Sequence, residues 1–411
     1  MPVPQRICRQ RPNGDFFLTA DDNGIIHRRD LSGQTQQTYR ASAAVAAVAV
    51  SPDGKFVLAG TILDSVYIWD LAGQAHRVLH VPTRINALAM SPGGLSVVTG
   101  GKNGATQCWD LSGNELLSVG RSDNVEVLAV AFSPDGQSIL TGTYNGIAKL
   151  WDRTTGAQKM VFDRRTFGGA SAVTFAPDGQ SVVIGHKNGT TKIWDIAAGK
   201  ARATLIELDS ADWVVTTPDG LFDASPDAMK LMYYVQGLEV IELGQLKDRY
   251  YEPGLLARVL GLAEGDLRRV HELGNRELPL YPLLLEATVE GDQVRVRLQE
   301  RDGGIGEVVV LLDGKIELIP DANPKRLSEF DIDLGAYADW LFPDQLNALS
   351  LVFYDKENLL PSTPHPITYP SDGTRSKGGP DTAPSSSILD RRNEALANTL
   401  YALVIGTSDY A

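Results

Sequence analysis

The stretch that decides the fold of this chain is "SPDGQSILTGTYNGIAKLWD", residues 133–152. It contains a turn signal, a short apolar run, a second turn signal at Asn145-Gly146, and a second run that ends in Trp-Asp. Pro-Asp-Gly predicts a tight turn between strands, and Asn-Gly predicts a two-residue hairpin because it supplies positive φ angles. A single unit of this kind cannot bury both faces of its sheet, so several must stack.

The same pattern recurs through the first half of the 411 residues, which is the signature of a repeat architecture. The first turn signal recurs at 51–54, 91–94, 133–136, 176–179 and 217–220, with a weaker copy at 11–14. The apolar runs that follow are "FFLTA", "FVLAG", "SVVTG", "SILTG" and "SVVIG". The last strand of the repeat ends at Asp30, Asp70, Asp110, Asp152 and Asp195. Four tryptophans occupy one position of the repeat, which predicts a structural role for them: Trp69, Trp109, Trp151 and Trp194.

These repeats resemble the WD40 family, and the resemblance implies a β-propeller over residues 1–245. Five blades are clear, and "DWVVTTPDGLFDAS" (212–225) begins a degenerate sixth that residues 230–243 would complete. The family often joins a His and a turn Asp to the Trp by hydrogen bonds. Here the turn residue is mostly Asn (Asn23, Asn103, Asn145, Asn188), no repeat shows the Gly-His pair, and Arg29 replaces the first Trp. Stability is therefore expected from packing between blades. Either the sixth blade closes the ring, or Met1 is not the natural start and blades precede it.

The second half begins with a predicted helical connector over residues 246–278, in which Gly261 and Gly274 stop short helices. Residues 279–370 return to short alternating strands, with a hairpin at Asp313-Gly314, and predict an immunoglobulin-like β-sandwich. The glycines of "RDGGIGEVVV" lack the helix and the Lys-Ser/Thr pair of a phosphate-binding loop, so they predict a bulged turn between strands.

Residues 371–397 are rich in Ser, Gly, Pro and Asp, and this composition predicts a flexible linker. Residues 398–411 contain the apolar run "LYALVIG" before a polar loop, which resembles the first strand of a caspase-like α/β domain. The order of repeats, "WVVTTPDGLFDAS", "GLEVIELGQLKDRYYEPGLL" and a sandwich with "GGIG" resembles bacterial WD40 proteins that end in a caspase-like domain of peptidase family C14. The resemblance implies that the chain is the truncated front part of such a protein.

The composition excludes several classes of protein. A net charge of −13 argues against nucleic acid as the main partner, because phosphate binding needs a basic surface. No stretch is long and apolar enough for a membrane helix, and residues 1–14 have no apolar core of a secretory signal. A cytoplasmic protein that does not bind membranes is therefore expected. The sequence leaves the oligomeric state open.

No catalytic, cofactor-binding or metal-binding residue is predicted. Cys8 and Cys108 both belong to the repeats, where Cys108 is expected to be a small buried hydrophobe. None of the histidines lies near a cysteine in the sequence as a nucleophile and base would: His27, His76, His80, His186, His271 and His365. The chain itself is thus expected to have no peptidase activity, although the resemblance implies a cysteine-type peptidase domain in the full-length protein.

Three functions remain open from the sequence. The first is a protein-interaction or sensing region, in which the propeller binds a partner or ligand to regulate the absent peptidase domain. The second is a stand-alone WD40 scaffold without an enzymatic domain. The third is a propeller enzyme, which the inward positions disfavour because they are Ser, Thr, Asn and apolar residues.

Overall fold

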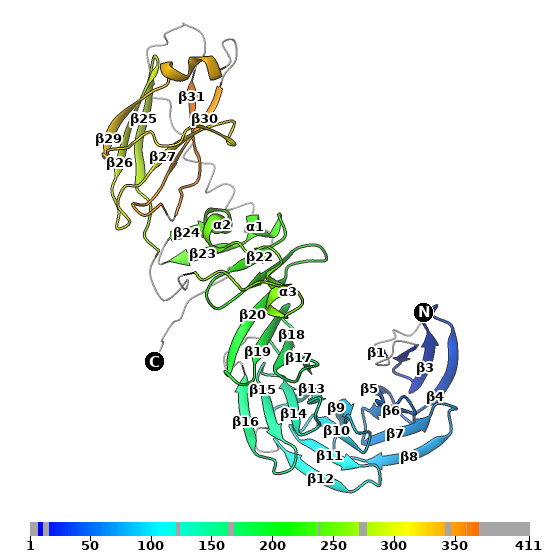
Figure 1. Cartoon of the computed structure of the whole chain (residues 1–411). Coiled ribbons are helices and arrows are strands. Elements are labelled where there is room, and N and C mark those ends of the chain that lie inside the picture. Colours follow the sequence, from blue (N-terminus) through cyan, green and yellow to red (C-terminus); the bar gives the residue numbers. More distant parts are fainter. Residues whose placement is uncertain are drawn as a thin grey trace. The chain divides into compact units, whose positions relative to one another are not determined.

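The computed structural model describes residues 7–10, 16–120, 124–162, 168–236, 239–270, 278–341, 347–358 and 360–369. The chain divides into two compact units, one ending at Ser210 and the other beginning at Ala211. Both units are built mainly from antiparallel strands (Figure 1), which confirms the predicted mainly β class. The predicted linker at 371–397 and the predicted strand at 398–411 lie outside the described residues.

The first unit contains five groups of four antiparallel strands, each paired in chain order and called blades 1 to 5 below. The strands of blades 1 and 2 are β1 (Ile7–Gln10), β2 (Phe16–Ala20), β3 (Ile25–Asp30), β4 (Thr35–Arg40), β5 (Val45–Val50), β6 (Phe56–Thr61), β7 (Ser65–Asp70) and β8 (Ala75–His80). Those of blades 3 and 4 are β9 (Ile85–Met90), β10 (Ser96–Gly101), β11 (Thr106–Asp110), β12 (Glu115–Val119), β13 (Val127–Phe132), β14 (Ser138–Thr143), β15 (Ala148–Asp152) and β16 (Gln158–Phe162). Blade 5 contains β17 (Ala170–Phe175), β18 (Ser181–His186), β19 (Thr190–Asp195) and β20 (Lys200–Glu207).

The blades of the first unit stand side by side in an arc (Figure 1), and the apolar core lies between successive blades. The first strands β5, β9, β13 and β17 follow the inner side of the arc, and the last strands β4, β8, β12 and β16 follow its outer side. Each core cluster combines one face of a blade with the facing side chains of the next blade. For example, Leu58 and Ile68 of blade 2 pack with Leu88 and Trp109 of blade 3. The predicted packing between blades therefore supplies the core.

The Asn-Gly turns differ from the predicted two-residue hairpins. The φ angles of Gly24, Gly104, Gly146 and Gly189 lie between +80° and +85°, but the preceding asparagines are not among the described residues with positive φ. In blade 3, Gly104 N donates to Gly101 O at 3.2 Å, and Gly101 N donates to Ala105 O at 2.9 Å. This is a three-residue loop made of a type I turn and a glycine bulge. The two-residue prediction was wrong because only the glycine takes the left-handed conformation.

Glycines at the end of the second strand let the next blade approach closely. A Cβ atom on Gly142 would lie 2.6 Å from the backbone oxygen of Ala170 in the neighbouring blade. At the equivalent Gly60, the nearest atoms would be the side-chain ends Ile85 Cγ2 and Leu88 Cδ2, both at 2.8 Å. A backbone carbonyl cannot move as a methyl group can, so the two glycines should differ in their tolerance of alanine.

We expect Gly142→Ala to lower the free energy of unfolding by about 1 to 3 kcal/mol, the usual cost of overpacking. Gly60→Ala is the matched control and should cost less, because Ile85 and Leu88 can rotate. Denaturant unfolding followed by circular dichroism measures both changes. Equal losses in the two variants would contradict this account of the contact.

The second unit begins with a small module, residues 211–270, that we call the connector module. Its elements are β21 (Trp213–Thr216), β22 (Phe222–Ala224), α1 (Ala228–Leu231), β23 (Tyr233–Gln236), β24 (Glu239–Glu242), the 3-10 helix η2 (Leu243–Leu246), α2 (Lys247–Tyr250) and α3 (Leu255–Val259). Among the described strands, β23 and β24 pair with each other in a two-stranded antiparallel sheet.

The predicted connector helices are present in part. Helix α3 ends at Val259, and Gly261 follows with φ +71° and donates its N–H to Arg258 O at 3.0 Å, as a helix-stop glycine does. Residues 264–270 form no helix, although the spacing of their leucines and valines predicts one. Gly274, the second predicted stop, lies outside the described residues.

The described residues from 283 to 369 form a sandwich of two antiparallel sheets. One sheet has the order β25-β26-β29 and the other the order β28-β27-β30-β31. The elements are β25 (Leu283–Glu290), β26 (Gln293–Gln299), β27 (Val308–Leu312), β28 (Ile316–Ile319), β29 (Glu329–Asp333), the 3-10 helix η3 (Gly335–Trp340), β30 (Asn347–Phe353) and β31 (His365–Tyr369). Strand β26 alternates between buried and exposed residues, and its Val294, Val296 and Leu298 join the core between the sheets.

Both turns predicted in the sandwich are confirmed. Asp313 and Gly314 have φ angles of +51° and +66°, and Lys315 N donates to Leu312 O at 3.1 Å. The "GGIG" segment begins in a turn before β27, where Gly304 N donates to Arg301 O at 2.9 Å, and Gly306 N then donates to Tyr354 O at 2.9 Å. A Cβ atom on Gly306 would meet the backbone oxygen of Asp355 at 1.9 Å, so this glycine is required by the close approach of two backbones.

Candidate interaction surface

The structure separates the cysteine and histidine side chains that it describes. Cys108 lies in β11 of blade 3 with 1% exposure, and burial raises the pKa of its thiol. This confirms the prediction of a small buried hydrophobe, since a raised thiol pKa disfavours the nucleophilic thiolate. Cys8 belongs to β1, but its side chain is not described.

The histidines lie in other parts of the fold. His27, His80 and His186 belong to blades 1, 2 and 5, and His365 belongs to the sandwich. His186 Nε2 lies 3.3 Å from Gly146 O and so joins blade 5 to the turn of blade 4. The side chains of His76 and His271 are not among those described. Within the described residues, no group of His, Cys, Asp and Glu side chains could hold a metal ion.

The repeat tryptophans are parts of the blade interfaces, as the sequence predicts. Trp69, Trp109 and Trp151 are at most 8% exposed, and Trp194 is half-buried against blade 4. Trp109 Nε1 donates to Thr99 Oγ1 at 3.1 Å, and Trp151 Nε1 donates to Thr141 Oγ1 at 3.0 Å. These contacts assign the tryptophans to packing and to the hydrogen bonds within their own blades.

The threonine partners are structural parts of the repeat that the sequence alone did not predict. In blade 1, Arg29 Nε donates to Thr19 Oγ1 at 3.3 Å, so the arginine takes over the donor role of the absent tryptophan. In blade 5 the threonine position holds Ile184, and Trp194 Nε1 is buried without a partner among the described residues. The sequence contains a signal for this hydrogen bond. The fourth residue of the apolar run is Thr in "FFLTA", "SVVTG" and "SILTG", but Ala in "FVLAG" and Ile in "SVVIG".

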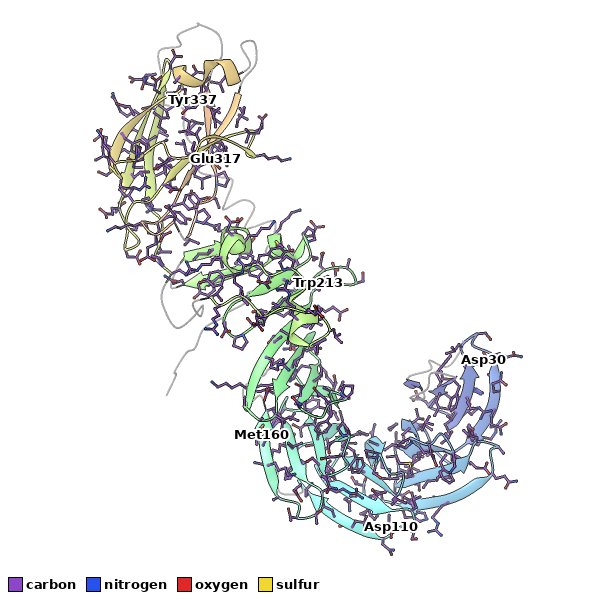
Figure 2. The ribbon with its side chains drawn as sticks, viewed as in Figure 1. Asp30, Asp110, Met160, Trp213, Glu317 and Tyr337 are labelled. Atoms are coloured by element: carbon purple, nitrogen blue, oxygen red, sulfur yellow. The ribbon has the colours of Figure 1, made fainter. Side chains whose placement is uncertain are left out.

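One set of loops is closed by its own hydrogen bonds. The turns between the third and fourth strands begin at Asp30, Asp70, Asp110, Asp152 and Asp195, whose carboxylates accept from the turn that follows. The N–H groups of Thr155 and Thr154 and the ammonium of Lys159 hold the pKa of Asp152 well below its usual range. Asp30 and Asp110 lie at the outer edge of the arc (Figure 2). These aspartates therefore stabilise the turns that follow them.

The loops between the second and third strands present aromatic and apolar side chains. We call their surface the Asn-Gly face, made of residues 21–24, 61–64, 101–104, 143–146 and 186–189. Tyr144 is 60% exposed and Leu63 is 58% exposed on this face. Lys187 Nζ of blade 5 lies 5.1 Å from the ring centroid of Tyr144 in blade 4. An exposed tyrosine held by a cation from the next blade is a rigid amphipathic contact of the kind enriched in protein interfaces.

The second unit buries two carboxylates where its two characteristic sequence segments meet. Asp223 Oδ2 of "LFDAS" accepts Gly254 N–H at 2.8 Å, and Glu252 N–H donates to Phe222 O at 2.8 Å. The Glu252 carboxylate forms ion pairs with Arg258 and with Arg268. The hydrogen bonds of Asp223 and Phe222 thus join two segments about 30 residues apart, and the one to the Asp223 carboxylate is charge-assisted.

Comparisons with known proteins agree with the repeat geometry. The family model described as WD domain, G-beta repeat matches residues 33–70, 114–152 and 161–195. The matches at 33–70 and 114–152 begin near the fourth strand of one blade and end with the third strand of the next. No curated protein matches the chain. Within the described part of the chain, no helix is both long and apolar enough to cross a membrane. The chain therefore contains WD40 repeats, as its sequence predicts.

Proposed function

We propose that this chain is a protein-interaction scaffold whose first unit binds a protein partner through the Asn-Gly face. WD40 repeats support an interaction role. The observation that carries the choice of face is the Tyr144–Lys187 pair, because it places an exposed aromatic ring across two neighbouring blades.

Photo-crosslinking in cells of the source organism tests this proposal. We expect a benzophenone amino acid at Tyr144, and a second at Leu63, to capture the same discrete protein. Leu95 is the matched control, since it lies in a turn on the opposite side of blade 3 and is 74% exposed. Equal capture from Leu95 would show that the face is wrong. If no protein is captured from any of the three positions, the proposed scaffold function is contradicted.

In a finer proposal, the partner or a ligand regulates a caspase-like cysteine peptidase that follows the chain in a longer protein. The order of the sequence segments supports this, as does their meeting around Asp223 and Glu252. The strand orders β25-β26-β29 and β28-β27-β30-β31 support an immunoglobulin-like sandwich as the spacer. The propeller extent 1–245, its sixth blade, and the cytoplasmic location stay predictions.

The mass of the native gene product separates the finer proposal from a stand-alone scaffold. A product well above 411 residues, with a cysteine peptidase activity absent from the present chain, would support regulation of an attached domain. A native product of 411 residues would leave the stand-alone scaffold. The crosslinking result does not depend on this outcome.

A further inference from the structure

The second unit contains a cavity of about 610 Å³, open to solvent and lined in part by exposed side chains, that the proposed interaction function does not use. Its walls come from helix α2, from residues 268–270, and from the loop between β30 and β31. Gln245, which lies just before α2, joins that segment to the loop between β30 and β31, because its Nε2 donates to Pro361 O at 2.6 Å. The volume lies within the roughly 300 to 1,000 Å³ of small-molecule sites.

Positive charge dominates the lining of this cavity. Arg249, Arg268 and Arg269 line it, against the single carboxylate of Asp248. Arg268 is fixed, since its Nε donates to Glu252 at 3.1 Å and its guanidinium also donates to Asp248 O and Tyr251 O. Neither Arg249 nor Arg269 has a carboxylate partner among the described residues. The Arg249 guanidinium lies 5.9 Å from the centroid of the Tyr250 ring, so it is held beside the pocket without an opposite charge, as is the guanidinium of Arg269.

The opposite wall adds neutral donors. Tyr354 is half-buried, and burial together with the nearby carboxylates of Asp248, Glu307 and Glu317 raises the pKa of its phenol, so the hydroxyl keeps its proton. Asn358 Oδ1 accepts Glu307 N–H at 3.0 Å, which directs its amide nitrogen to other partners. Val270 and Pro361 supply apolar surface beside these donors.

We propose that this cavity binds a small anionic ligand, with a phosphate or carboxylate group on an organic body of about nucleotide size. Arg249 and Arg269 would hold the anionic group, as guanidinium forks hold phosphates and carboxylates. Tyr354 and Asn358 would donate from the opposite wall, while Asp248 opposes the ligand charge. The proposal is independent of partner binding by the blades.

Isothermal titration of the full chain with adenosine monophosphate, adenosine and citrate tests it. We expect adenosine monophosphate or citrate to bind and adenosine to fail, and the two anions distinguish a phosphate from a carboxylate preference. The affinity should fall as salt is raised, because the contact is electrostatic. Binding of adenosine as tightly as adenosine monophosphate, or of neither anion, would overturn the proposal.

Variants that change one kind of charge test whether the arginines strengthen anion binding and whether Asp248 weakens it. Arg249→Ala combined with Arg269→Ala should weaken anion binding at least tenfold, whereas Asp248→Asn should tighten it a few-fold. Arg295→Ala is the control for the loss of an arginine elsewhere on the second unit, because Arg295 pairs with Asp331 on the exposed side of the sandwich. If the double variant does not fold, the affinity of Asp248→Asn and the salt dependence still test whether the pocket binds anions. Weaker binding by Asp248→Asn, or an equal loss in Arg295→Ala, would contradict the assignment.

Discussion

Replacing Trp151 with alanine should lower the free energy of unfolding of the first unit by about 3 to 5 kcal/mol, the usual cost for a buried aromatic side chain. The ring is 8% exposed and packs with Val98, Val127 and Ile139 between blades 3 and 4. Its removal opens a cavity in that interface and also takes away the partner of Thr141. Both losses destabilise the packing of blade 4 against blade 3.

Hydrogen–deuterium exchange of the β14 and β15 amides, with denaturant unfolding by circular dichroism, measures this loss. Trp151→Phe should cost less, because it keeps most of the apolar ring and loses the Nε1 donor. Trp213→Ala is the control for residue type, since Trp213 is 37% exposed, and it should stay within about 1 kcal/mol of the parent. A Trp151→Ala protein with unchanged stability and lost partner binding would make this tryptophan a ligand contact.

Replacing Glu252 with alanine should lower the free energy of unfolding of the second unit by about 3 kcal/mol. Its side chain is 8% exposed and pairs with Arg258 and Arg268, which are 29% and 42% exposed. Removing one member of a buried ion pair costs about 3 to 5 kcal/mol, because the remaining charge is left uncompensated. The lower end applies here, since both guanidinium groups keep contact with water.

Thermal unfolding and limited proteolysis of the connector module measure this effect. Glu252→Gln should fall between the parent and the alanine variant, because it keeps an acceptor without the charge. Arg258→Ala should cost less than Glu252→Ala, since Arg268 still neutralises the carboxylate. The opposite ranking would show that Arg258 acts mainly through its packing.

The sequence predicts the blades well because their information is local and repeated. Pro-Asp-Gly, an apolar run and Trp-Asp recur at a nearly constant spacing, so each strand could be placed from its own copy. The turn type was missed because Asn-Gly suits several loops, and the strand pairing on both sides decides which of them forms. Asp313-Gly314, by contrast, does take positive φ at both positions.

The sites could be predicted much less well. The contact between Asp223 and Gly254 joins segments with no shared periodicity, and only the fold shows that a carboxylate meets that N–H group. The same holds for the cavity, where Arg249 and Tyr354 lie more than a hundred residues apart in the sequence. Residues 264–270 were predicted as a helix from their leucine spacing, but tertiary contacts such as those of Arg268 hold them in another conformation.

The offset between sequence repeat and blade has a consequence for how such a chain can evolve. The matched repeats at 33–70 and 114–152 each supply the outer strand of one blade and three strands of the next, so each repeat spans two neighbouring blades. A duplication or deletion of one repeat unit within a gene therefore adds or removes four strands, the number in one blade, and leaves the remaining strands in register. Recombination between copies that are equivalent in register preserves the packing, whereas a crossover at the edge of a blade would separate an outer strand from the repeat that positions it.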